Sequence, residues 1–219
     1  MKQSGPEGYL AVPNTGGGPG VLVLHAWWGL NDTMKEVCDR LAGEGFVAFA
    51  PDLYRGKLAS TIEEAEVLGR QLDDNADRAK ADIAAAVDYL WERVTLQEHG
   101  LGVLGFSLGA YYALQLSADD PRRVRAVVLF YGTGDADFHR AKAAYLGHFA
   151  GNDPYEPPEG VDWLENTIMS SGRPVRFYRY EGVGHWFFES DRPDAFDEPA
   201  AQLAWDRSVA FLRETLSPE

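Results

Sequence analysis

The chain has 219 residues, of which 45% are hydrophobic and 25% are charged, so its length and composition fit one ordinary globular domain spanning residues 1–219. Its 34 acidic residues outnumber its 20 basic residues, and the net charge of −14 argues against nucleic acid or an anionic membrane as a partner. Residues 1–8 contain no apolar signal segment, and the apolar stretch 21–30 is too short to span a bilayer, so we expect a cytoplasmic protein.

Short runs of strand-forming residues recur along the whole chain, and most of them are continuously apolar. They are 9–12, 21–25, 46–50, 102–106, 126–131, 145–150 and 175–180. Continuously apolar runs are typical of parallel strands that are buried on both faces of a sheet. We therefore predict a mostly parallel sheet of about seven strands.

Helical patterns lie between these runs. In 34–42 the apolar residues recur at helical spacing, after a predicted capping box of Thr33 and Glu36, and a second box of Thr61 and Glu64 precedes a strongly charged helix. Apolar residues at helical spacing also mark 83–94, 110–116 and 205–216. Alternating strands and helices predict an α/β fold with helices on both faces of the sheet. The connection 132–142 is too short for a lid domain, so we expect an open site.

The segment around Ser107 carries the most specific functional pattern. Gly105-x-Ser107-x-Gly109 follows an apolar strand and precedes a helical stretch, which is the context of a nucleophile elbow. Glycine at both flanking positions removes side chains where strand and helix would pass too closely. The alternative is a plain glycine-rich turn. The pattern G-x-G-x-x-G at 100–105 runs into the strand instead of opening a helix, so we do not interpret it as a dinucleotide site.

A serine hydroxyl needs an adjacent general base, for which histidine is suited. In this architecture the partners follow the serine in the order acid, then histidine. His185 is the leading candidate because it follows the strand 175–180 in an apparent flexible turn at the carboxyl edge of the sheet. The other histidines are expected to be at the pocket wall (His25), solvated (His99 and His139) or in the core (His148).

For the acid that orients the histidine, Asp153 leads, since it follows the strand 145–150 and lies between serine and histidine in sequence. Asp135 and Asp137, after the preceding strand, are the alternatives. An oxyanion hole needs two backbone donors, and we predict the N–H groups of Leu108, next to the serine, and of Trp27, in the loop after an earlier strand.

From about Val21 to Leu212 the chain resembles the dienelactone hydrolase family of α/β-hydrolases. The landmarks are 24–31 (Leu-His-Ala-Trp-Trp-Gly-Leu-Asn), 50–54 (Ala-Pro-Asp-Leu-Tyr), 105–109, 148–153 (His-Phe-Ala-Gly-Asn-Asp) and 180–185 (Tyr-Glu-Gly-Val-Gly-His). The resemblance implies an α/β-hydrolase fold and hydrolysis of an ester or lactone without a cofactor. It maps the nucleophile, acid and base onto Ser107, Asp153 and His185.

The chain departs from the family's best-known members at three places. Those members use cysteine as the nucleophile, where this chain has Ser107, and carry a glutamate where it has Ala26. A serine with a histidine–aspartate pair does not need that carboxylate, so the two departures are mutually consistent. They also bind the lactone's carboxylate through an arginine after the histidine, where this chain has Glu189.

A glutamate facing the pocket would repel an anionic substrate, so we expect a neutral ester with a small apolar acyl group, bound by Trp28, Trp186 and Phe187. The chain is thus predicted to be a serine hydrolase that acts through an acyl-enzyme. Alternatives are a non-catalytic small-molecule binding protein on the same fold, or a thioesterase or acyltransferase.

Zinc and paired-cysteine motifs are absent from the sequence, so we predict no metal, and Cys38 is expected to be a packed thiol.

Overall fold

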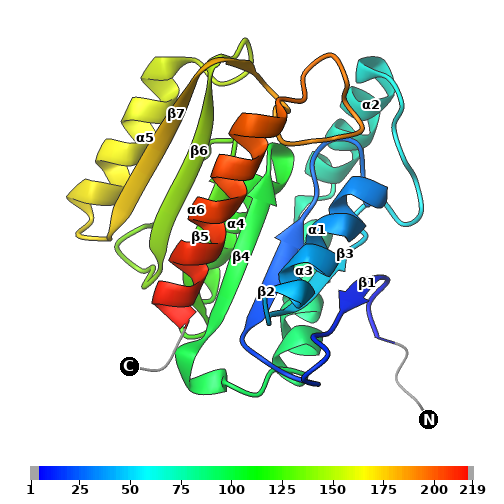
Figure 1. Ribbon diagram of the computed structural model, residues 1–219, viewed down its shortest axis with the longest axis vertical. Coiled ribbons are helices and arrows are strands. Elements are labelled where there is room, and N and C mark those ends of the chain that lie inside the picture. Colours follow the sequence, from blue (N-terminus) through cyan, green and yellow to red (C-terminus); the bar gives the residue numbers. More distant parts are fainter. Residues whose placement is uncertain (1–4, 217–219) are drawn as a thin grey trace.

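The computed structural model describes residues 5–216, so the ends of the predicted domain lie outside the described part of the chain. Seven strands form one sheet in the order β1-β3-β2-β4-β5-β6-β7 (Figure 1). Their bounds are β1 Gly8–Ala11, β2 Gly20–Leu24, β3 Val47–Pro51, β4 Leu101–Phe106, β5 Val124–Phe130, β6 Ala144–Asn152 and β7 Val175–Gly184. Only β1 is antiparallel to its neighbour among these strands, which confirms the predicted mostly parallel sheet.

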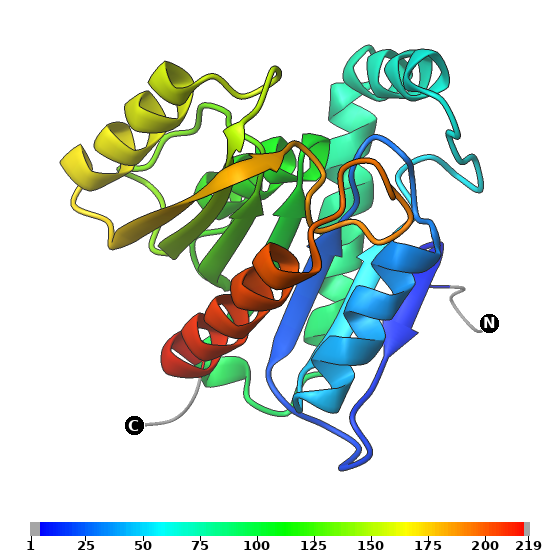
Figure 2. The same ribbon diagram turned by 45° about the horizontal axis from the view of Figure 1, so that its top comes forward.

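Helices cover both faces of this sheet, as predicted. They are α1 Asp32–Gly43, α2 Ile62–Asp73, α3 Ala76–Trp91, α4 Leu108–Asp119, α5 Pro158–Ser170 and α6 Glu198–Leu216, with one turn of 3₁₀-helix at Gln97–His99. Helices α1 and α6 pack on one face, and α3, α4 and α5 pack on the other (Figures 1 and 2). No helix within residues 5–216 has both the length and the apolar character needed to cross a membrane.

The sequence patterns predicted some helix starts correctly and missed others. Thr61 caps α2 as predicted, accepting a hydrogen bond from the N–H of Glu64. The predicted cap of α1 was wrong, because Asn31, and not Thr33, accepts from the N–H of Met34. The Thr33 hydroxyl instead donates to Asp191, 2.9 Å away and far along the chain. Helix α5 was not predicted at all, and the connection between β5 and β6 contains no inserted lid, as expected.

The middle strands are buried because helices lie on both of their faces. All six residues of β4 and all five of β2 are buried, which explains their continuously apolar sequences. Cys38 is fully buried on the inner face of α1, and burial raises the pKa of its thiol to about 12, as expected for a packed thiol.

The last two strands continue further than the apolar pattern indicated. The predicted flexible turn before His185 is instead the end of β7, where Gly184 pairs with Asn152 of β6. The register between these strands shifts after Ala150, because β7 has two more residues than β6 before the last pair. Asp153 and His185 therefore leave the sheet side by side.

A buried polar network ties β6 to α6, and His148 is at its centre with no exposed surface. The hydroxyl of Ser208 donates to Ala204 O and therefore accepts from His148 Nε2–H over 3.0 Å. His148 Nδ1 then accepts from Tyr180 Oη over 2.8 Å, and Arg207 donates to that same oxygen over 3.1 Å. The imidazole is thus neutral and fully hydrogen-bonded, as expected for a core histidine.

This network makes folding stability fall in acid. Burial, followed by the charge of Arg207, lowers the pKa of His148 to about 3, so the unfolded chain binds an extra proton between that value and the ordinary value of 6.5. The free energy of unfolding should then fall by up to about 1.4 kcal/mol for each pH unit below about 6.5. Urea unfolding at a series of pH values should show a shallower acid slope for His148→Gln. His139→Gln, on an exposed loop, should keep the wild-type slope; equal slopes for all three proteins would contradict the assignment.

Candidate active site

Ser107 lies at a sharp turn between β4 and α4. Its backbone has φ 49° and ψ −113°, a left-handed conformation that non-glycine residues rarely adopt. A Cβ at Gly105 would lie 2.5 Å from Gly109 O, and one at Gly109 would collide with Leu24 O. Glycine at these two positions is therefore required for the strand and helix to approach each other, as predicted for a nucleophile elbow.

Ser107, His185 and Asp153 form one hydrogen-bonded chain. Ser107 Oγ lies 3.0 Å from His185 Nε2, and His185 Nδ1 lies 2.7 Å from Asp153 Oδ2. The imidazole is 4% exposed and the Asp153 carboxylate is 1% exposed. With Asp153 accepting from Nδ1–H, Nε2 is left free to accept the serine proton.

The loop after β6 fixes the second oxygen of Asp153. Asp153 Oδ1 accepts from the N–H of Tyr155 at 2.9 Å and of Glu156 at 3.1 Å. Glu156 in turn accepts from the N–H and hydroxyl of Thr133, which follows β5, at 3.1 and 2.7 Å. Burial raises the pKa of Glu156, while its hydrogen bonds to Thr133 oppose that shift. The acid is thus held by its own loop, and that loop is held by the neighbouring strand.

The other candidates for acid and base lie elsewhere. Asp135 and Asp137 are exposed. The ring of His25 is buried between two loops, where it accepts from Leu53 N–H at 3.3 Å and donates from Nδ1 to Ala26 O at 2.8 Å. Burial lowers the pKa of His25, which keeps it neutral. His25 therefore fixes the loop that contains Trp27 and does not line a pocket, contrary to expectation.

The two backbone N–H groups predicted to form the oxyanion hole have no backbone partner in the described part of the chain. Leu108 is the first residue of α4, where a helical N–H has no intrahelical partner. Trp27 follows the strand β2 in the loop fixed by His25. Within residues 5–216, neither N–H donates to another backbone group. The positive end of the α4 dipole adds to the preference for negative charge beside Leu108.

Aromatic rings surround His185, but they are not all the ones expected. Trp28 is 3% exposed and Phe187 is fully buried, so these two rings belong to the core and offer no open surface to a substrate. Trp186, with a left-handed φ of 64°, is partly exposed and its ring lies 4.9 Å from the His185 ring. Tyr155, missed from the sequence, is 42% exposed and packs at 4.9 Å on the same imidazole.

Glu189 does not face a pocket. The expectation that it would repel an anionic substrate is therefore wrong. The side chain has no exposed surface, and its Oε1 accepts from the hydroxyl of Tyr131 at 2.9 Å. Burial raises the pKa of Glu189 to about 8. The ring of Tyr131 lies 4.9 Å from the ring of His185, between Glu189 and the Ser107 cluster.

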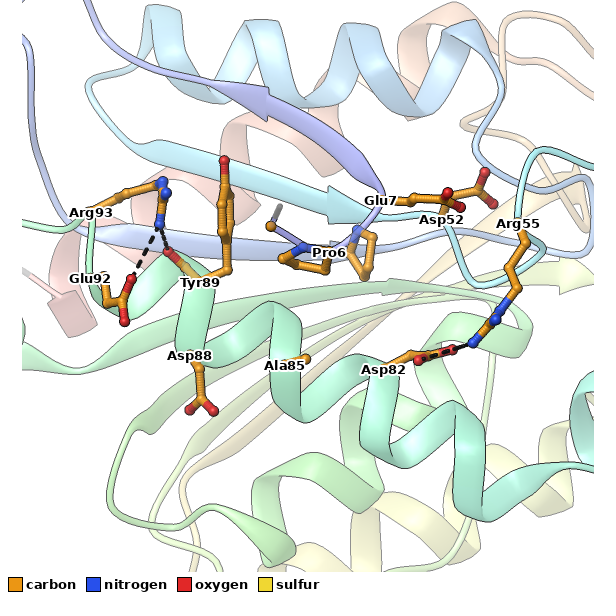
Figure 3. Close-up of a pocket in the computed structure, with 12 residues that line it drawn as sticks. Pro6, Glu7, Asp52, Arg55, Asp82, Ala85, Asp88, Tyr89, Glu92 and Arg93 are labelled. Carbon is orange, nitrogen blue, oxygen red and sulfur yellow. Dashed lines mark hydrogen bonds and ion pairs between the residues drawn. The ribbon is translucent and has the colours of Figure 1, made fainter. Parts of the chain in front are cut away.

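A cavity of about 790 Å³ lies at the opposite edge of the sheet, between α3 and the end of β3 (Figure 3). Four of its charged side chains lie in pairs: Arg55 contacts Asp82, and Arg93 lies beside Glu92. None of the residues that line it belongs to the Ser107 cluster. In the described part of the chain, no three histidine, cysteine or acidic side chains gather as metal ligands would.

A model of the dienelactone hydrolase family matches residues 7–216, which is nearly the whole chain. The chain belongs to the dienelactone hydrolase family. It is 36% identical over 218 residues to Protein usf of Aquifex pyrophilus, covering 96% of this chain and 94% of that protein. It is 28% identical over 216 residues to a carboxymethylenebutenolidase of a Pseudomonas species, covering 94% and 88% of the two chains.

Solved structures also contain this fold. A dienelactone hydrolase-like promiscuous phosphotriesterase from metagenomic libraries superimposes with a TM-score of 0.83 at 21% identity, over 92% of this chain and 88% of that one. The resemblance inferred from the sequence motifs is therefore confirmed, both for the dienelactone hydrolase family and for its α/β-hydrolase fold.

Within this family member, Glu189 should make stability fall between about pH 4.5 and pH 8. Its pKa is raised from 4.5 to about 8 on folding, so between these values only the folded state binds the proton, and stability is lost as the pH rises until the loss levels off above 8. Glu189→Gln cannot ionise and should become progressively more stable than the wild type from pH 5 to 8 in urea unfolding, with a constant difference above that. Glu181→Gln, on the exposed end of β7, should follow the wild-type curve. Parallel curves for Glu189→Gln and wild type would contradict the burial of a protonated carboxyl group.

Proposed function

We propose that this protein hydrolyses a small carboxylic ester or lactone, with Ser107 as the nucleophile, His185 as the general base and Asp153 as the orienting acid. The observation that carries the proposal is the continuous chain of hydrogen bonds of 3.0 and 2.7 Å that joins the three side chains at the apex of a strained elbow. Membership of the dienelactone hydrolase family, and the carboxymethylenebutenolidase name of one relative, support the same class of bond.

The reaction proceeds in two balanced halves. Ser107 Oγ bonds to the carbonyl carbon while its proton passes to His185 Nε2, and the carbonyl electron pair moves onto oxygen. The bond to the leaving alcohol then breaks, and the imidazolium returns its proton to that alcohol. A water molecule next gives a proton to His185 and attacks the acyl carbon. Ser107 leaves with the proton that the imidazolium returns, and the acid is released.

The oxyanion that forms in each half is accepted by the N–H groups of Leu108 and Trp27. Both donors are backbone groups held by neighbouring structure, Leu108 by α4 and Trp27 by the His25 contacts. They therefore need little reorganisation when charge develops on the carbonyl oxygen. In serine hydrolases one such donor contributes about 3–4 kcal/mol to the transition state.

The substrate is a small molecule with an apolar acyl or alcohol group. The rings of Tyr155 and Trp186 lie beside His185, and the partly exposed Trp27 packs edge-on against Tyr155 at 5.9 Å. Such a rim favours apolar groups through burial of their surface. The net charge of −14 supports the exclusion of nucleic acid and anionic membrane surfaces as substrates or partners.

Hydrolysis of a series of short-chain aryl esters tests this function. Ser107→Ala should lower kcat/KM by about 10⁴-fold, to the rate left by binding and the oxyanion hole alone. Ser170→Ala, an exposed serine at the end of α5, should match the wild type. A fluorophosphonate probe should label the wild type and not Ser107→Ala. If neither protein hydrolyses esters and the wild type does not label, the fold serves as a small-molecule binder instead.

Removing the charge of the acid tests its role separately. Asp153→Asn keeps the shape of the side chain but presents an amide to His185 Nδ1, which favours the wrong imidazole tautomer. We expect kcat to fall by about 10³- to 10⁴-fold with a small change in KM. Asp135→Asn, in the exposed loop after β5, is the matched control and should retain wild-type kinetics. Activity that survives in Asp153→Asn would remove Asp153 from the mechanism.

A further inference from the structure

Tyr131 and Glu189 form a buried pair directly behind the His185 imidazole. Both side chains have no exposed surface, and the tyrosine hydroxyl donates to Glu189 Oε1 over 2.9 Å. The second carboxyl oxygen, Oε2, is also buried and has no hydrogen-bond partner in the described part of the chain. A carboxyl group with one hydrogen bond in a core is costly, and an apolar side chain of similar size would be cheaper. Stability alone therefore does not account for this pair.

Tyr131 is connected to the nucleophile through its own backbone neighbours. The preceding residue, Phe130, accepts from the N–H of Ser107 at 2.9 Å, and the following residue, Gly132, packs so closely that any Cβ would collide with Ser107 O. Tyr131 itself has a left-handed φ of 37°, and its N–H donates to His148 O at 2.8 Å. Strained backbone of this kind persists only where surrounding contacts impose it.

Glu189 is connected to the base through the turn that follows His185. Its N–H donates to Trp186 O at 2.9 Å, which closes the turn immediately after the histidine. The ring of Tyr131 packs on the imidazole with centroids 4.9 Å apart and planes at 59°. The hydrogen bond between Tyr131 and Glu189 thus joins the strand end that supports Ser107 to the turn that carries His185.

We propose that Glu189 is a positioning residue that acts through Tyr131, holding the His185 imidazole in line with the hydroxyl of Ser107. This proposal rests on the proposed function, because it assigns a role to His185 as the base. Glu189 and Tyr131 do not touch the reacting atoms. They restrict rotation and displacement of the imidazole, which determine how often Nε2 meets the serine proton at hydrogen-bond distance.

The charged neighbours of the pair do not provide an alternative role for it. Asp191 and Arg192, on the same turn, act on Glu189 with opposite sign, and Arg192 packs over the ring of Trp28 at 3.9 Å. Asp191 is held by the hydroxyl of Thr33 and the amide of Asn31 at the start of α1. Asp153, on the far side of the imidazole, already has three hydrogen bonds. Tyr131 is therefore the group through which Glu189 reaches the site.

Steady-state kinetics on an aryl ester, with Tyr131→Phe, Glu189→Gln and Tyr145→Phe, test the proposal. Tyr131→Phe removes the hydroxyl and keeps the ring, and we expect kcat to fall about ten-fold or more with KM nearly unchanged. Glu189→Gln retains an amide oxygen that can accept from Tyr131, so it should stay within about three-fold of the wild type. Tyr145→Phe is the matched control, because it removes a buried 2.7 Å hydrogen bond to Ser117 on the other face of the sheet.

The outcomes separate positioning from general stability. Tyr145→Phe should lower the melting temperature as Tyr131→Phe does, yet keep wild-type kcat. If Tyr131→Phe and Tyr145→Phe both keep the wild-type kcat, or if their kcat values fall by the same factor, the positioning role is wrong while the hydrolase function stands. If wild type shows neither ester hydrolysis nor probe labelling, the proposed function fails. In that case the crystal structure of Tyr131→Phe tests the positioning proposal by itself. A distance from Ser107 Oγ to His185 Nε2 that is still 3.0 Å would overturn the proposal.

Discussion

The pairing of Asn152 with Gly184 at the ends of β6 and β7 is the constraint on which the site depends. It places Asp153 and His185 as the next residue on each strand, so their side chains leave the sheet together. The register shift after Ala150 is needed for this, because without the two extra residues in β7 Asn152 would pair with Gly182, and His185 would lie further along than Asp153. Parallel strands joined by the crossover helix α5 thus bring together the proposed acid and base, which are 32 residues apart in the chain.

Around this pairing, side-chain hydrogen bonds connect loops that the sheet does not join. His25 links the Trp27 loop to the segment after β3, Glu156 links the acid loop to β5, and Asp191 links the turn after His185 to α1. These hydrogen bonds couple the loops, so moving one loop breaks a hydrogen bond to the next. The rigidity of the site comes from these contacts more than from secondary structure, since most of the residues involved lie in loops.

The sequence predicted the features that depend on a few consecutive residues, and it missed the contacts between residues that are far apart in the chain. Runs of strand-forming residues, most of them continuously apolar, identified the seven strands of the described chain. The glycines around Ser107 identified the elbow. Both signals are contained in a few consecutive residues. The cap of α1 was misassigned because the Thr33 hydroxyl is taken by Asp191, 158 residues away. Glu189 and Tyr131 are 58 residues apart, and their burial follows from packing that no local period encodes. Helix α5 lacks a side-chain cap, and the proline at its first position is the start signal that the prediction missed.

The backbone of Trp186 has a consequence for how this pocket can change. Trp186 immediately follows His185 and has a left-handed φ of 64°. This backbone conformation favours glycine or asparagine, whereas the aromatic rim beside His185 favours an aromatic side chain. A branched residue such as valine or isoleucine there would satisfy neither demand. Variation in substrate range is therefore easier to reach through Tyr155, which lies in the adjacent loop without that backbone conflict. Laboratory or natural evolution of this scaffold should accordingly concentrate its exchanges on the acid loop and leave the turn after the histidine unchanged.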